Sequence, residues 1–114
     1  MQYLLMIATP ETKPYGDEDG EVVHKEYMAF GQEMGAQGVL QGGNQLRPTA
    51  DATTVRVRDG EVLTTDGPFA ETTEQIAGYY LVECADLDAA IDVAAKIPGA
   101  RHGSIEVRPV VKFG

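Results

Sequence analysis

Apolar residues occupy both alternating sets of positions in two segments of the chain, 2–8 and 76–84. Successive side chains of a strand point to opposite faces of a sheet, so this pattern is typical of a strand that is covered on both sides. We predict that these two segments are the central strands of a sheet.

Two further segments repeat apolar residues at helical spacing, one within residues 23–34 and the other within residues 87–95. Asp86 is typical of the residue that caps the start of a helix, and Pro98 follows the second stripe. Each stripe predicts a helix that packs its apolar side on the sheet.

The remaining strand segments have features of edge strands. Gly42-Gly43 interrupts the strand pattern of residues 39–46, and Pro109 lies within residues 104–113. Glycine and proline inside a strand are tolerated mainly at sheet edges and bulges. We predict that both segments lie at the edges of the sheet.

A hairpin is predicted where residues 54–58 and 61–64 flank the dipeptide Asp59-Gly60. An Asp-Gly pair suits a two-residue type I′ turn between antiparallel strands. In the register that this turn sets, Arg58 lies opposite Glu61.

The order of the predicted elements is β-α-β, a hairpin, and β-α-β, which is the ferredoxin-like split βαβ arrangement of the α+β class with an inserted hairpin. Residues 1–114 are enough for one domain. Two helices cover one face of such a sheet and leave the other face without a layer. We expect a homodimer that packs sheet against sheet, because large exposed apolar patches are rare on monomers. The alternative is that the hairpin folds back over this face.

The charge and the residue content exclude several classes of function. Eighteen acidic and nine basic residues give a formal net charge of −9, which argues against nucleic acid or an anionic membrane surface as a partner. No run approaches the ~18 apolar residues of a membrane span, and the chain lacks the features of a signal peptide. One cysteine and two histidines cannot form a four-ligand His/Cys zinc site. We therefore expect a cytoplasmic protein without a metal or other cofactor.

Residues 65–75 contain an acidic bend. Pro68 fixes its own φ and keeps Gly67 out of the helical region, while Asp66 places a carboxylate at the start of the bend. The whole segment 59–95 carries nine acidic residues and no lysine or arginine. Any countercharge must come from elsewhere in the fold.

A resemblance to a known family is carried by three stretches of sequence: Asp66-Gly67-Pro68-Phe69-Ala70-Glu71-Thr72, Gly78-Tyr79-Tyr80-Leu81 and Ile105-Glu106-Val107-Arg108-Pro109-Val110. Together they resemble the DGPF-motif branch of the YCII-related proteins, and the resemblance covers nearly the whole chain. It implies a ferredoxin-like fold assembled as a dimeric α+β barrel, a bacterial origin, and an occurrence beside or fused to sigma factors of the extracytoplasmic-function type. It implies no established activity, although the wider superfamily includes isomerases, dehalogenases and monooxygenases that act on small molecules in the barrel cavity.

Two positions depart from the family pattern. Thr73 stands where the motif usually has lysine, and His24, the one histidine of the first predicted helix, has no aspartate at an evident pairing position. The His/Asp pair proposed for YCII-related proteins therefore cannot be transferred directly to this chain.

Asp66 and His102 are the candidate catalytic residues. A carboxylate in a pocket acts as a general acid or base when its surroundings move its pKa toward neutrality, so Asp66 is the first candidate for proton transfer. His102 lies just before the last strand and is the second, because histidine titrates near physiological pH. The alternatives are that Asp66 caps its own turn and that His102 is an exposed surface residue, as we expect for His24.

Four further residues are candidates for binding a substrate: Arg108, Glu71, Gln45 and Tyr79. If Arg108 faces inward it needs a carboxylate partner, for which Asp66 or Glu71 is available. Gln45, with Arg47, ends the second strand and is placed to line the same cavity. Tyr79 and Tyr80 alternate faces, so one of them should direct its hydroxyl toward a dimer-side cavity. A salt bridge or an exposed position is the structural alternative for these residues.

Three functional hypotheses follow. The first is a homodimeric enzyme whose cavity performs acid–base chemistry, such as isomerisation or elimination, on a small organic molecule. The second is a non-enzymatic ligand-binding or regulatory module that partners a sigma factor or another protein through its acidic surface. The third is a structural member of the family with a filled cavity. Convergence of Asp66, His102 and Arg108 on one enclosed pocket would favour the enzyme.

Overall fold

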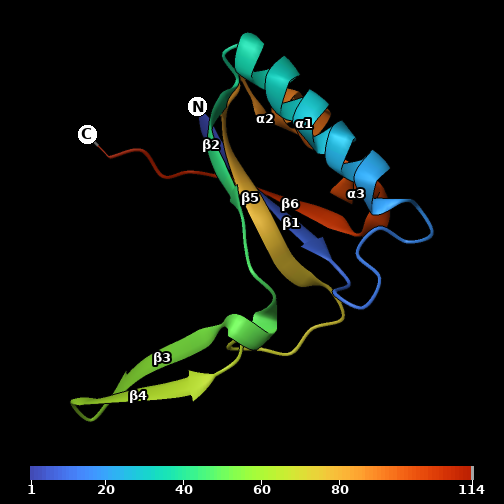
Figure 1. Ribbon diagram of the computed structural model, residues 1–114. Helices are drawn as coiled ribbons and strands as arrows, with labels where there is room; N and C mark the ends of the chain where they lie inside the picture. Colours follow the sequence, from blue (N-terminus) through green and yellow to red (C-terminus); the bar gives the residue numbers. More distant parts are fainter. Residues whose placement is uncertain (114) are drawn as a thin grey trace.

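The computed structural model describes residues 1–113 and has a mixed α+β architecture (Figure 1). In chain order the elements are β1 (Gln2–Thr9), α1 (Gly20–Ala36), β2 (Leu40–Gln45), the short 3-10 helix η1 (Thr49–Asp51), β3 (Thr53–Arg58), β4 (Glu61–Asp66), β5 (Gln75–Glu83), α2 (Leu87–Ala95), α3 (Gly99–His102) and β6 (Ser104–Pro109).

Four of the strands form one antiparallel sheet in the order β2-β5-β1-β6, which is compatible with a ferredoxin-like fold. The two segments that are apolar on both sides are β1 and β5, and they lie in the middle of the sheet as predicted. The two segments that contain glycine or proline are the edge strands β2 and β6. The register of β2 against β5 shifts between Leu40 and Gly42, at the position where the glycines indicated a bulge.

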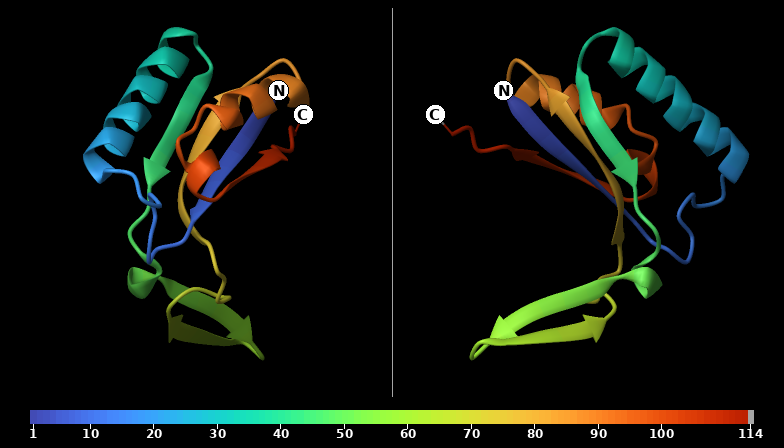
Figure 2. Two further views of the ribbon diagram at one scale, coloured as in Figure 1. Left: turned by 90° about the vertical axis from the view of Figure 1, so that its right-hand side faces the viewer. Right: turned by 60° about the vertical axis from the view of Figure 1, so that its left-hand side comes forward.

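The helices lie on one face of this sheet (Figure 2). From α1, the side chains of Val23, Phe30 and Met34 are buried, which confirms the predicted stripe. They belong to a core that includes Leu5 of β1 and Val82 of β5. Burial of such side chains is the main favourable term that holds the helices on the sheet.

Aspartates cap the two longer helices. The side chain of Asp19 accepts a hydrogen bond from the backbone N–H of Glu21 at 2.8 Å. Asp86, the predicted cap, accepts one from the N–H of Ala89 at 2.9 Å. Each cap satisfies an N–H group that has no partner within the helix.

The other face of the sheet has no helix on it. The strand registers place six apolar or aromatic residues on this open face, which are Leu4, Met6, Ala8, Ile76, Tyr79 and Leu81. Ser104, Glu106 and Arg108 of β6 lie on the same face, opposite Ala8, Met6 and Leu4. They are only partly buried or exposed, in contrast to the buried residues on the helix side.

β3 and β4 pair with each other in a separate two-stranded sheet, here called the arm (residues 53–66). Asp59 (φ 52°) and Gly60 (φ 78°) form its turn, and Arg58 lies opposite Glu61 as predicted. The arm projects beyond the end of the four-stranded sheet (Figures 1 and 2). The radius of gyration is therefore 15.9 Å, compared with about 13 Å for a compact domain of roughly 100 residues.

Candidate functional site

A cavity of about 520 Å³ lies on the helix side of the sheet, where β1 and β2 end and α1 begins. Pro14 and Tyr15 of the loop before α1 contribute to its wall, as do residues 46–48 that follow β2. Apolar and aromatic side chains make up most of the lining, with a few polar groups among them. This composition is typical of sites that bind small molecules.

Two glycines leave the floor of the cavity without side chains. A Cβ atom on Gly43 would lie 2.7 Å from the carbonyl oxygen of Tyr79, and one on Gly78 would lie 2.9 Å from the carbonyl oxygen of Asn44. Real Cβ contacts are not this short, so the close approach of β2 and β5 requires glycine at both positions. The ring of Tyr80 borders the same floor, with its Cδ1 atom 2.7 Å from the Cβ position on Gly43.

Tyr27 and Tyr80 provide phenol groups on the helix side of the cavity. The ring of Tyr80 packs against Phe30, with 5.0 Å between the ring centroids. Burial raises the pKa of both tyrosines, and a hydrogen bond from the backbone N–H of Gly99 partly opposes this for Tyr27. Both phenols are therefore uncharged at neutral pH and retain an O–H donor.

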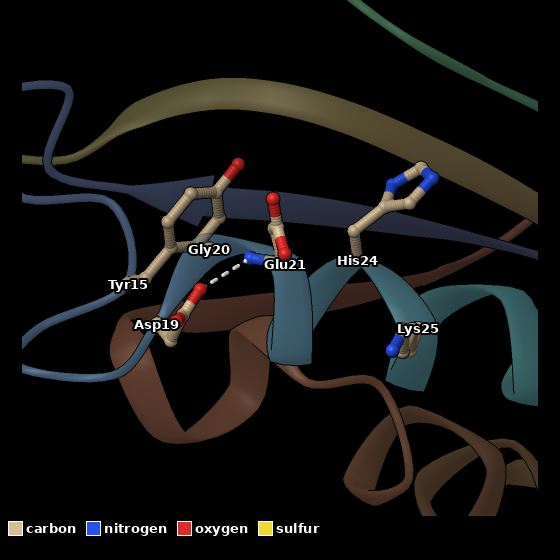
Figure 3. Close-up of a pocket in the computed structure, with 6 residues that line it drawn as sticks. All are labelled: Tyr15, Asp19, Gly20, Glu21, His24 and Lys25. Atoms are coloured by element: carbon tan, nitrogen blue, oxygen red, sulfur yellow. Dashed lines mark hydrogen bonds between the residues drawn. The ribbon is translucent and has the colours of Figure 1, made fainter.

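His24 and Tyr15 lie at the rim, where the cavity borders a second, more open hollow. Figure 3 shows Tyr15, Glu21 and His24 on one side of the start of α1, with Lys25 pointing elsewhere. His24 is exposed, so its imidazole is accessible both to solvent and to a molecule in the cavity.

Glu11 and Arg47 are the two charged side chains of the cavity wall apart from the histidine, and both have partners. The carboxylate of Glu11 accepts hydrogen bonds from the backbone N–H and the hydroxyl of Thr49, at 2.7 and 2.8 Å. Arg47 donates to Asp51 at 3.0 Å. The contacts of Glu11 with Thr49 tie the residues after β2 to the loop after β1.

A cluster of charged residues holds the loop before α1 against α3. Arg101 donates two hydrogen bonds to Glu18, each of 2.9 Å, and a further one to Glu26. The side chain of His102, only 5% exposed, contacts Glu18 through Nε2. The hydrogen bonds from Arg101 and then His102 lower the pKa of Glu18 to about 2. This Glu18 cluster positions the segment that carries Tyr15.

Comparison with known proteins places the chain in a family. The model of the YCII-related domain matches residues 1–114. This chain belongs to the YCII-related domain family. It is also 39% identical, over 104 residues, to an uncharacterised protein of Rhizobium meliloti (strain 1021), which covers 90% of this chain and 84% of that protein.

Of the four predicted binding residues, Gln45 and Tyr79 border the cavity. Gln45 lies opposite Gly78 on the helix side, and Arg47 follows it in the same wall. Tyr79 also borders the cavity, but its register partner is Met6, so its ring lies on the open face. Its hydroxyl accepts a hydrogen bond from Asn44 at 3.0 Å.

Asp66, Glu71, His102 and Arg108 do not line this cavity. Asp66 ends β4 and is exposed, and within residues 1–113 its carboxylate has no hydrogen-bond partner. The bend is closed instead by Gly67, whose N–H donates to the carbonyl of Ala52 at 2.7 Å. Gly67 has φ 99°, in the left-handed region that favours glycine. Glu71 is exposed in the loop that follows.

Arg108 is 70% exposed, and its nearest carboxylate is that of Glu106 on the same strand, at 3.9 Å. Neither Asp66 nor Glu71 is its partner in the chain. The interpretation of His102 as an exposed residue is wrong, because α3 buries its ring against Glu18. Asp66, His102 and Arg108 therefore do not meet in one pocket of a single chain.

The acidic residues before and at the start of α1, Asp17, Glu18, Asp19 and Glu21, are exposed. Two of them also make specific contacts, because Glu18 binds Arg101 and His102, and Asp19 caps α1. Sequence reasoning overlooked Tyr27 as a cavity residue. Its position in the apolar stripe indicated a core residue. The one sequence signal for a role at a cavity was its hydroxyl group at an otherwise apolar position.

Within residues 1–113 the side chains form no group of three or more potential metal ligands. The same residues contain no helix whose length and apolar content would suffice to cross a membrane.

Proposed function

We propose that this YCII-related domain, as a member of the DGPF-motif branch, binds a small organic molecule in the cavity between α1 and the sheet. The observation that carries the proposal is the cavity itself, which combines a glycine floor with tyrosine walls. Its volume of about 520 Å³ falls within the range of roughly 300–1,000 Å³ that is usual for ligand sites.

Acid–base catalysis is the second part of the proposal. His24 is the histidine at the rim, and histidine is the side chain that most often serves as a general acid or base. This moves the candidate proton-transfer residue from Asp66 to His24 within one chain. Asp66 and His102 remain hypotheses for catalysis only if other residues bring a substrate to them.

A thermal-shift screen tests ligand binding. The panel contains small organic acids, phenols, lactones and aromatic ketones, and the protein is the full chain. A ligand at about 100 times its dissociation constant stabilises the folded state by ~2.7 kcal/mol, and each kcal/mol raises Tm by roughly 4–8 °C for a domain near this size. We expect at least one compound to give such a shift.

Two tryptophan variants on the same helix locate the site. His24→Trp fills the rim of the cavity and should abolish the shift. Met28→Trp places the same side chain one turn further along α1, at an exposed position that does not line the cavity, and should preserve it. Asp66→Asn should also preserve the shift. Loss of binding in Asp66→Asn with retention in His24→Trp would contradict the proposed location.

We also propose that the domain is a homodimer that packs open face to open face, as in a dimeric α+β barrel. The support is the group of apolar residues on the open face, beside Glu106 and Arg108 of β6, and the exposure of Val55, Val57, Val62 and Phe69 in and beside the arm. Apolar side chains that a single chain leaves exposed are typical of an interface between subunits.

Sedimentation analysis of two matched variants tests the dimer. Met6→Glu places a carboxylate in the centre of the open face and should give a monomer of 12.3 kDa. Met28→Glu makes the same change on the exposed side of α1 and should sediment as the wild-type dimer. A wild-type protein that stays monomeric at high concentration would contradict this proposal.

A further inference from the structure

The cavity is rich in tyrosine. Of the five tyrosines of the chain, Tyr15, Tyr27, Tyr79 and Tyr80 border it. The ring of Tyr79 lies on the open face of the sheet, which leaves the other three on the helix side. Aromatic rings offer flat apolar surfaces that favour stacking and edge contacts with another ring.

The two charged side chains of the wall, Glu11 and Arg47, already have hydrogen-bond partners in the protein. Each carboxylate oxygen of Glu11 accepts a hydrogen bond from Thr49, and Arg47 forms a salt bridge with Asp51. Both side chains are exposed, whereas the half-buried part of the wall, formed by Tyr27 and Tyr80, offers no charge that could pair with a charged ligand. Burial of an unpaired charge is costly, so the cavity favours an uncharged molecule.

The phenols supply hydrogen-bond donors. Burial keeps the phenol of Tyr27 protonated at neutral pH, so its O–H is a hydrogen-bond donor on the cavity wall. A Cβ atom on Gly99 would lie 2.8 Å from this oxygen, which shows how closely the phenol approaches the start of α3. A donor in an otherwise apolar wall selects a ligand that places an acceptor oxygen opposite it.

We propose, on the basis of the binding function above, that the ligand is an uncharged aromatic compound with a carbonyl oxygen. The ring lies among Tyr15, Tyr27 and Tyr80, and the carbonyl accepts a hydrogen bond from the hydroxyl of Tyr27. Such a ligand matches the apolar walls, the paired charges and the free phenol proton together.

Three probes of similar shape test the ligand class by calorimetric titration of the full chain: acetylnaphthalene, ethylnaphthalene and naphthoate, substituted at the same ring position. Acetylnaphthalene carries the carbonyl, ethylnaphthalene lacks it, and naphthoate adds a charge. We expect the ketone to bind about tenfold more tightly than the hydrocarbon, as one hydrogen bond to a buried donor allows. Naphthoate should bind most weakly.

Two phenylalanine variants assign the donor. Tyr27→Phe should reduce the affinity for the ketone to that for the hydrocarbon and leave the hydrocarbon unaffected. Tyr3→Phe removes the hydroxyl of a buried tyrosine that does not line the cavity, and should change neither affinity. Thermal melts of both variants show whether each is folded. Selectivity for the ketone that survives in Tyr27→Phe would overturn the assignment of the donor.

The outcomes separate this inference from the proposed function. Equal affinity for ketone and hydrocarbon would overturn the carbonyl inference, and tighter binding of naphthoate would overturn the inference of a neutral ligand. Failure of all three probes would overturn the ligand class, while a different compound whose binding is lost in His24→Trp would still support a binding cavity. If no compound of the thermal-shift panel raised Tm, that result would instead contradict the proposed binding function itself.

Discussion

The four-stranded sheet and the arm are both antiparallel, but only the sheet has an apolar layer packed on it. Leu5 and Val82 of the sheet are fully buried beneath the helices. In the arm, Val62 is 68% exposed, and Val55 and Val57 are similarly exposed. Its base is held by the backbone bond from Gly67 to Ala52 and by the hydroxyl of Thr54, which donates to the carbonyl of Gly67 at 2.8 Å.

This contrast shows which parts of the molecule are stabilised by the chain itself. An isolated two-stranded hairpin is marginally stable in water, and three or more strands or a packed helix are usually needed. The sheet meets that requirement and the arm does not. The arm of a single chain is therefore the part whose stability depends most on its turn and on any surface it packs against.

The largest expected effect distinguishes the two regions directly. Leu5→Ala removes a fully buried side chain and should lower the free energy of unfolding by about 2–5 kcal/mol. Val57→Ala truncates an exposed side chain of the arm and should lower it by less than about 0.5 kcal/mol. Urea unfolding at low protein concentration measures both. A cost for Val57→Ala close to that of Leu5→Ala would show that the arm is packed in solution.

A smaller effect separates the two regions through their glycines. Gly60→Ala forces a Cβ atom into the left-handed conformation of the turn (φ 78°) and should destabilise the arm by about 1 kcal/mol. Hydrogen exchange should then accelerate at the amides of β3 and β4 while those of β1 and β5 keep their protection.

Gly35→Ala is the control for this substitution. Gly35 lies in α1 with open space around the position of a Cβ atom, so alanine there should preserve or increase stability. Equal acceleration of exchange in β1 and β3 of Gly60→Ala would indicate that the arm and the sheet unfold as one unit.

The smallest expected effect concerns pH. The pKa of Glu18 is lowered from 4.5 to about 2 by its hydrogen bonds with Arg101 and then His102. A carboxyl group whose folded-state pKa is lowered stabilises the fold above its unfolded pKa, and this contribution is lost as the pH falls through the folded value. The difference in Tm between the wild type and Glu18→Gln should therefore be greatest above pH 4.5 and should shrink toward pH 2.

Glu61→Gln makes the same change in the arm. Among residues 1–113, Glu61 has no hydrogen-bond or salt-bridge partner, although it lies opposite Arg58. Its melting profile against pH should run parallel to that of the wild type. A difference for Glu18→Gln that stays constant with pH would contradict the role of its ionised form.

The motif around Asp66 shows what a local sequence motif can and cannot predict about a functional site. Pro68 and Gly67 indicated a tight bend, and the structure forms it with Gly67 at φ 99°. The sequence did not reveal that this bend lies at the base of the arm, away from the cavity. A local motif reports local backbone geometry, whereas the neighbours of a side chain depend on contacts between distant segments.

Tyr27 and Glu18 are residues whose contacts in the structure could not be predicted from the sequence. The helical spacing predicted that Tyr27 packs near the sheet, but only the packing of α1 against the strands makes it a cavity residue, together with Gly43 and Gly78. In the sequence, Glu18 is one of several acidic residues in a loop. Its partners Arg101 and His102 lie in α3, more than eighty residues away along the chain. No local pattern encodes that pairing.

By itself, the sequence determined the central strands, the edge strands, the helices, their aspartate cap at Asp86 and the turn of the arm. These follow from periodicity and from the conformational limits of single residues, which act over a few positions of the chain. The tertiary structure decided where the cavity lies, that Gln45 and Arg47 border it, and that Asp66, His102 and Arg108 do not share it. Such groupings depend on how the strands and helices pack in three dimensions, and periodicity carries no information about that.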